Sequence, residues 1–271
     1  MSTFHVGRGP RRIVCLTEEP TEILYALGEQ DRVVGISAYT VRPPEAAQEK
    51  PVVSAFIGGS VEKICALEPD LVIGFSDIQA ELARSLIAAN QQVLIFNQRS
   101  IQEILDVILA VGQLVHRGRE ARALVDGYIA GLEAALTRAA TRRHRPKVYF
   151  EEWDEPMICG IRWVSELIQI AGGEDVFADR AVGAGAKDRF VSVEEVVARA
   201  PEVMLASWCG KALDRPAVQA RLADVPAVAQ GRIHELPPEV ILQPGPACLT
   251  DGLALVESLL HGASEPRPPH R

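Results

Sequence analysis

Short β-rich apolar runs alternate with segments of helical spacing along the first half of the chain. The apolar runs are 12–16, 32–36, 71–73 and 93–96. The helical segments are 21–27, 60–68 and 81–89, and a proline-containing loop occupies 39–50. Gly28 follows the first helical segment, which suits the residue after a helix C-terminus. This strand–helix alternation is typical of a parallel sheet and predicts an α/β lobe over residues 1–115.

The middle of the chain is helical without intervening strands. Ser100 and Glu103 have the spacing of a capping box, and helical periodicity continues from there to Arg143 with a break near Gly118. The second piece, 119–142, would be about 36 Å long at 1.5 Å per residue. We therefore predict a linking backbone helix within residues 116–145.

Strand–helix alternation then restarts and predicts a second α/β lobe over 146–271. Its expected strands are 147–150, 203–206 and 233–236, and its expected helices are 164–171 and 250–260. The segment 60–73 aligns with 192–205, with Ser, Val, Glu, Ala and Pro at matching positions. The two lobes are therefore expected to be related. The Pro-rich tail, 262–271, is expected to fray.

Composition and charge limit the class of protein. The 271 residues are 48% hydrophobic and 24% charged, with a net charge of −8, which is an ordinary globular balance. An acidic chain without basic clusters is a poor nucleic-acid binder. No apolar stretch reaches the roughly 20 residues of a membrane span. We expect a monomer that does not bind nucleic acid and does not span a membrane.

The compartment is left open by the N-terminus and the cysteines. No apolar segment follows the polar N-terminus as it would in a secretory signal. The five cysteines are scattered and include no Cys-x-x-Cys pair, which is typical of a reducing compartment. The chain as it stands is expected to be cytoplasmic, or periplasmic if a leader was removed.

Common catalytic and metal-binding motifs are missing. The sequence has no Gly-x-Gly-x-x-Gly fingerprint, Walker loop, Gly-x-Ser-x-Gly elbow or His-Glu-x-x-His, and its six histidines lack metal-ligand spacing. We predict no catalytic residues, no metal site and no intrinsic cofactor. Cys209, after an expected strand, is the one candidate nucleophile, and the alternative is a small buried residue.

Carboxylates, aromatic residues and arginines gather in the loops after strands and before helices. In an α/β sheet these loops form the ligand crevice. Flat rings and guanidinium groups suit a large, partly planar ligand with carboxylate or amide edges. The candidate binding residues are Glu19, Tyr39, Phe56, Phe75, Glu152, Trp153, Arg162, Trp163, Arg189 and Trp208.

Several motifs resemble the class III substrate-binding proteins of ABC importers, the helical-backbone metal receptors. The most specific block is 60–73, and 12–28, 171–173, 208–210 and 242–246 extend the match. Within that family the chain is most similar to cobalamin-binding proteins. The resemblance implies two Rossmann-like lobes with central parallel sheets, joined by one long backbone helix.

The resemblance also implies a function. It implies a non-catalytic protein that holds a corrinoid, a vitamin B12-like metal chelate, in a cleft between the lobes. Gln243 joins the candidate binding residues, although many relatives carry arginine there. Glu62 and Glu194 match a pair of surface glutamates that dock onto importer permease subunits, and they also lie near helix N-termini, where a carboxylate stabilises the helix dipole.

Two alternatives remain open at this stage. The chain could be a cytoplasmic enzyme or corrinoid-processing protein that reuses the fold, with Cys209 as nucleophile or axial ligand. The ligand could instead be haem or a ferric siderophore.

Overall fold

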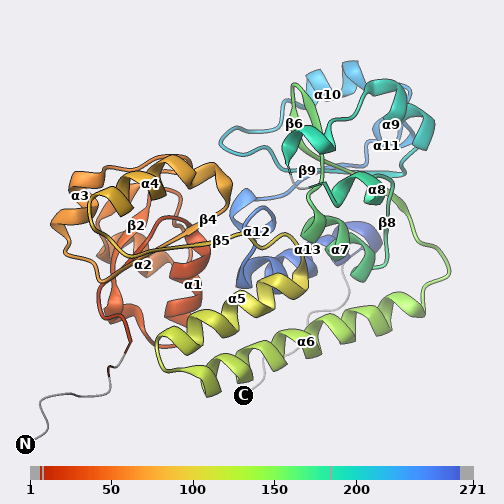
Figure 1. Ribbon diagram of the computed structural model, residues 1–271. Coiled ribbons are helices and arrows are strands. Elements are labelled where there is room, and N and C mark those ends of the chain that lie inside the picture. Colours follow the sequence, from red (N-terminus) through yellow and green to blue (C-terminus); the bar gives the residue numbers. More distant parts are fainter. Residues whose placement is uncertain (1–6, 8, 184, 263–271) are drawn as a thin grey trace, which may run out of the picture. The chain divides into compact units, whose positions relative to one another are not determined.

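Each half of the chain folds around its own β-sheet in the computed structural model (Figure 1), which describes residues 7, 9–183 and 185–262. The first unit comprises the residues up to Gln98 and 102–127, and the second comprises 99–101 and the residues from Tyr128 on. The tail expected to fray begins at Gly262 and otherwise lies outside the described residues.

The first sheet is parallel throughout and has the order β3-β2-β1-β4-β5. Its strands are β1 (Ile13–Cys15), β2 (Val33–Ser37), β3 (Val52–Ser54), β4 (Leu71–Phe75) and β5 (Val93–Phe96). The central strand β1 is completely buried, as its unbroken apolar sequence requires. Because all five strands run the same way, their carboxyl ends share one edge of the sheet.

The helices of the first unit begin and end close to the predicted positions. They are α1 (Glu18–Ala26), α2 (Pro44–Glu49), α3 (Val61–Ala66), α4 (Ala80–Ala88) and most of α5 (Ile101–Leu114). Gly28 has a φ of +73°, in agreement with its predicted place after the first helix. The loop expected at 39–50 is partly wrong, because Pro44 starts a short helix there.

The second sheet has the order β10-β9-β6-β7, and β8 also pairs with β6. Its strands are β6 (Lys147–Asp154), β7 (Met157–Cys159), β8 (Glu174–Asp175), β9 (Val203–Ala206) and β10 (Ile233–Glu235). All pairs are parallel except β6–β7, which is an antiparallel hairpin. The first strand of this half runs to Asp154, four residues beyond its predicted end.

Short helices connect the strands of the second unit. They are α7 (Arg162–Ile170), α8 (Ala178–Ala181), α9 (Val193–Arg199), α10 (Arg215–Arg221), α11 (Pro226–Ala229), α12 (Pro238–Ile241) and α13 (Leu253–His261). The last expected helix, 250–260, begins as a π-helical turn at Cys248–Gly252 before α13 continues it.

The long helix α6 (Gly118–Ala140) joins the two halves of the chain, as predicted. Its 23 residues correspond to about 34 Å at 1.5 Å per residue. The preceding helix ends at Leu114, so the break expected near Gly118 is confirmed. The boundary between the two units falls inside α6, after Gly127.

Four parallel strands have the same order in both sheets, β2-β1-β4-β5 in the first and β8-β6-β9-β10 in the second, which supports the predicted relationship between the halves. β1 lies between β2 and β4, and β6 lies in the same way between β8 and β9. Corresponding serines also cap corresponding helices. Ser60 Oγ accepts a hydrogen bond from the backbone N–H of Lys63 at 3.2 Å, and Ser192 Oγ accepts one from Glu195 at 3.3 Å.

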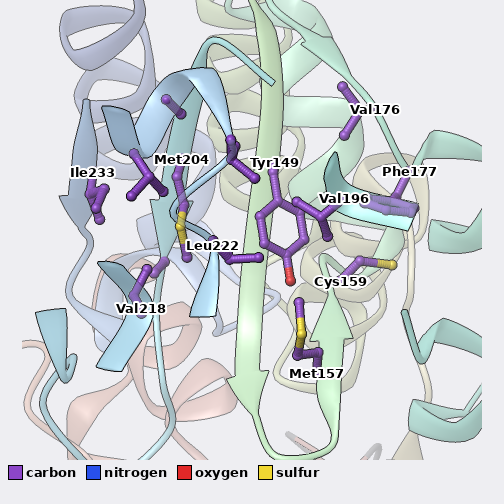
Figure 2. Packing of buried hydrophobic residues seen from close by; sticks show 14 of the residues in the cluster. Tyr149, Met157, Cys159, Val176, Phe177, Val196, Met204, Val218, Leu222 and Ile233 are labelled. Carbon is purple, nitrogen blue, oxygen red and sulfur yellow. The ribbon is translucent and has the colours of Figure 1, made fainter. Parts of the chain in front are cut away.

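A dense apolar cluster fixes β6 within the second unit (Figure 2). Tyr149 is fully buried on this strand and contacts Phe177 edge to face, with ring centroids 5.6 Å apart. Met204 on β9 and Val196 on α9 complete the packing around it. The cluster holds rigid the strand whose far end carries Glu151 to Asp154. Within residues 9–183 and 185–262, no helix is long and apolar enough to cross a membrane.

Candidate functional site

Gln79 ties together the carboxyl ends of three strands in the first unit. Its buried side chain accepts a hydrogen bond from the Phe75 N–H at 3.0 Å and donates to the carbonyls of Leu16 at 3.3 Å and Phe56 at 3.0 Å. A Cβ on Gly74 would lie 2.4 Å from Gln79 Oε1, so glycine is required for this approach. Sequence reasoning missed Gln79 because nothing in its local pattern marks these long-range bonds.

Exposed apolar side chains follow the strands at this same edge. Tyr39, after β2, is 45% exposed, Ile57, after β3, is 65% exposed, and Ile78, after β4, is 41% exposed. Phe56 is half-buried beside Ile57, whereas Phe75 is buried at the end of β4. Clustered apolar side chains on a surface mark a ligand or partner site. The two isoleucines carry neither an aromatic ring nor a charge, the features that marked the candidate binding residues in the sequence.

The two carboxylates that follow β1 do not point into solvent. Glu18 and Glu19 form the first turn of α1, and both are buried. Burial raises the pKa of Glu18 to about 8, with a further contribution from the neighbouring Glu19 carboxylate. Burial also raises the pKa of Glu19. Glu18 therefore holds its proton at neutral pH and adds little negative charge to this edge.

In the second unit, a fully buried carboxylate at the end of β6 organises the site. Glu151 accepts hydrogen bonds from Tyr149 Oη at 2.9 Å and from Trp208 Nε1 at 3.2 Å. Arg221 Nη2 contacts both of its oxygens, at 2.7 and 2.9 Å. Burial raises the pKa of Glu151, and the Arg221 guanidinium opposes that rise. This network holds the indole edge of Trp208 in place.

Glu152 and Arg189, two of the predicted binding residues, form an ion pair with each other. Arg189 Nη1 lies 2.6 Å from Glu152 Oε2, and Nη2 lies 2.9 Å from Oε1. Arg189 is buried and also donates to the carbonyl of Cys159 at 2.6 Å. The guanidinium thus closes the loop before α9 onto the β6–β7 hairpin.

Trp153 and Trp208 are brought together around a lysine. Lys211 Nζ lies 4.3 Å from the ring centroid of Trp153 and 4.7 Å from that of Trp208. The same ammonium is 2.6 Å from Asp154 Oδ1. Trp153 Nε1 donates to the carbonyl of Glu155 at 3.0 Å. Lys211 is absent from the candidate binding residues because it carries no sequence signal beyond its place after a strand.

The predicted residues on and near α7 have different surroundings. Arg162 is exposed and pairs with Glu166 one turn later at 2.9 Å. Trp163 is buried, and its Nε1 donates to the carbonyl of Ile241 at 2.9 Å. Gln243 is buried shortly after that acceptor. Trp163 therefore fastens α7 to the end of α12 within the second unit.

Glu62 and Glu194 occupy equivalent exposed positions, each in the first turn of its helix. The Ser192 hydroxyl lowers the pKa of Glu194, which keeps that carboxylate ionised. Cys209 is exposed, so the alternative of a small buried residue is wrong. Among the described residues, no group of three or more His, Cys, Asp or Glu side chains could hold a metal ion.

Known proteins resemble this chain over nearly its whole length. A family model described as "Periplasmic binding protein" matches residues 13–240. A vitamin B12-binding protein of Vibrio parahaemolyticus is 27% identical over 259 residues, which are 94% of this chain and 90% of that protein.

Two solved structures have the same fold. The periplasmic vitamin B12 binding protein of Vibrio cholerae is 26% identical, with a TM-score of 0.73 over 93% of this chain and 97% of its own. The periplasmic heme-binding protein RhuT from Roseiflexus, in its apo form, is 28% identical, with a TM-score of 0.76 over 93% of this chain and 100% of its own.

Proposed function

This chain belongs to the periplasmic binding protein family, and from that premise we propose that its ligand is a corrinoid. As a member of the family it is a substrate-binding protein of the ABC-importer type and not an enzyme. The observation that carries the choice of ligand is the alignment of 94% of the chain with a vitamin B12-binding protein.

The chemistry of the strand ends supports this ligand. A corrin offers a flat apolar face and a periphery of amide arms. The first unit supplies apolar contact through Tyr39, Phe56 and the isoleucines beside them. The second unit supplies the indole of Trp153 and the guanidinium of Arg162. Apolar contact with a few fixed polar groups is typical of sites for large cofactors.

The buried residues of the predicted set have a different part in this proposal. Glu19, Phe75, Trp163, Arg189 and Gln243 are all buried, and Glu152 is held in the ion pair with Arg189. We assign them the shaping of the loops that bear the accessible contacts.

Haem is the second candidate ligand. The apo structure of RhuT, a heme-binding protein, is 28% identical to this chain, slightly above the 26% of the solved vitamin B12 binder. A porphyrin shares the flat apolar face of a corrin but carries carboxylates in place of amide arms. The two ligands therefore differ most in the charge that the site must accept.

A binding titration decides between these ligands. Calorimetry with cyanocobalamin, cobinamide, haem and a ferric siderophore is expected to give a dissociation constant below about 10 μM for the corrinoids, or about −7 kcal/mol. Trp153→Ala should weaken binding by about 2 kcal/mol, as a buried aromatic anchor does. Leu136→Ala, an exposed apolar truncation on α6, is the matched control. Failure of both corrinoids to bind would reject the proposal.

We assign contact with the importer's permease subunits to Glu62 and Glu194. Their equivalent, exposed positions on related helices support a role in docking to basic pockets of permease subunits, one glutamate from each unit. We place that encounter in the periplasm. The double substitution Glu62→Ala with Glu194→Ala should leave ligand affinity unchanged and reduce uptake by cells. Unchanged uptake would reduce both residues to helix caps.

A further inference from the structure

The segment after β9 turns back so that a lysine lies over the tryptophan that precedes it. Gly210 has a φ of +80°, the conformation of the third residue of a type II turn, where glycine is favoured. The Lys211 N–H approaches the Trp208 carbonyl at 3.5 Å across this turn. The turn directs Lys211 toward the β6–β7 hairpin and its Trp153.

Three groups surround the ammonium of Lys211. The faces of Trp153 and Trp208 lie 4.3 and 4.7 Å from Nζ, within the distance of a cation–π interaction. Asp154 supplies the balancing charge at 2.6 Å. The lysine side chain remains 41% exposed, so solvent and solutes reach it. This is a cation site built from two rings and a carboxylate, with a residue of the chain itself as its occupant.

The walls of this site are fixed more firmly than its occupant. The indole N–H of Trp208 is bonded to Glu151, which Arg221 holds in turn. Arg221 also donates to the Asp154 carbonyl at 2.8 Å. Lysine, by contrast, is a flexible four-carbon chain ending in a point charge. The Lys211 side chain can therefore move away while the two indole rings stay in place.

We propose that Lys211 is an internal competitor that covers the Trp153–Trp208 pair and must be displaced when the ligand stacks on these rings. The nature of the ligand rests on the proposed function above. A flat ring system and an ammonium cannot share the same indole face at 4.3 Å. Ligands that cannot replace the lost contacts are therefore selected against, which makes Lys211 a determinant of specificity.

Whether Lys211 covers the two rings is tested without any chelate, by acrylamide quenching of tryptophan fluorescence. Lys211→Ala should increase quenching of the ligand-free protein, because it uncovers two of the three tryptophans, while Trp163 stays buried. Lys63→Ala removes the same charge from an exposed position in the first unit and is the control. Tetramethylammonium, a cation that can occupy the vacated site, should restore protection in Lys211→Ala alone. If Lys211→Ala is quenched no more than the unaltered protein, the proposal that Lys211 covers the rings is wrong.

The competition is tested by the affinity for cyanocobalamin. Lys211→Ala should bind it about tenfold more tightly, or about 1.4 kcal/mol, whereas Lys211→Arg, which keeps the cation, should bind as the unaltered protein does. Equal or weaker binding by Lys211→Ala would overturn the competition. If no protein binds any chelate, the corrinoid proposal fails, and the quenching result still decides whether Lys211 covers the rings.

Discussion

Removal of Arg221 should destabilise the second unit strongly, because it leaves a carboxylate buried without its cation. Glu151 is 0% exposed and receives two hydrogen bonds from Arg221. Breaking a buried ion pair from one side typically costs about 3–5 kcal/mol. We expect Arg221→Met to lower the free energy of unfolding by an amount in that range. The double variant Glu151→Gln with Arg221→Met leaves no buried charge behind. Its loss in free energy of unfolding should therefore be no more than about half that of the single variant.

The free energy of unfolding that Arg221→Met loses should depend on pH, and its direction follows from the pKa of Glu151. Burial already raises the folded-state pKa of Glu151 above its ordinary value of 4.5. A carboxyl with a raised pKa binds its proton more tightly when folded, so stability falls as pH rises through the interval above 4.5. Loss of Arg221 widens this interval. The cost of Arg221→Met should therefore be larger at pH 8 than at pH 5, and the pH dependence should disappear when Glu151 is also replaced.

Urea unfolding followed by tryptophan fluorescence measures this effect selectively. All three tryptophans of the chain lie in the second unit, so the signal reports that unit even if the two units unfold in separate steps. A cost below about 1 kcal/mol for Arg221→Met, or a double variant as unstable as the single one, would refute the view that Arg221 neutralises a buried charge.

Three further predictions concern other parts of the chain. Gly74→Ala, which places a Cβ 2.4 Å from a buried amide oxygen, should cost about 1–3 kcal/mol by circular dichroism melts, whereas Gly58→Ala, with nothing within 4 Å, should cost little. Cys209 should react with a thiol reagent in the folded protein, whereas Cys15, whose pKa burial raises to about 12, should react only after unfolding. Because burial raises the pKa of Glu18 to about 8, the stability of the first unit should fall between pH 4.5 and 8. Glu18→Gln should make that fall smaller in hydrogen exchange, with the remainder due to Glu19, whose pKa burial also raises. An unchanged slope would contradict the assignment.

The fold was largely predictable because its main elements carry strong local patterns. The apolar runs ending at Leu16, Ile73 and Phe96 each became a strand, since buried parallel strands need apolar residues on both faces. The 23-residue helix α6 followed from unbroken helical periodicity. The helix at Pro44 and the hairpin strand at Met157 were missed because elements of three to six residues leave little periodicity to detect.

The contacts of the candidate residues were less predictable than the fold. Trp153, expected after a strand, lies inside β6, and its ring and that of Trp208 both lie against Lys211 because β6 and β9 are neighbours. The pairing of Arg221 with Glu151 joins residues 70 positions apart, and that of Lys211 with Asp154 joins residues 57 apart. Such partners depend on loop geometry that no local pattern encodes.

The related halves have diverged where their equivalent strands end, and the divergence bears on ligand selection. After β1, burial raises the pKa of Glu18 to about 8, and exposed apolar side chains such as Ile57 follow other strands of the same sheet. Within β6, Glu151 is paired with Arg221, and Lys211 lies over the ring of Trp208. Each unit therefore has its own chemistry where its strands end, with apolar side chains in the first and paired charges in the second. Substitutions in the first unit should change affinity for all flat chelates alike, whereas substitutions of the charges in the second unit should change which chelate is preferred.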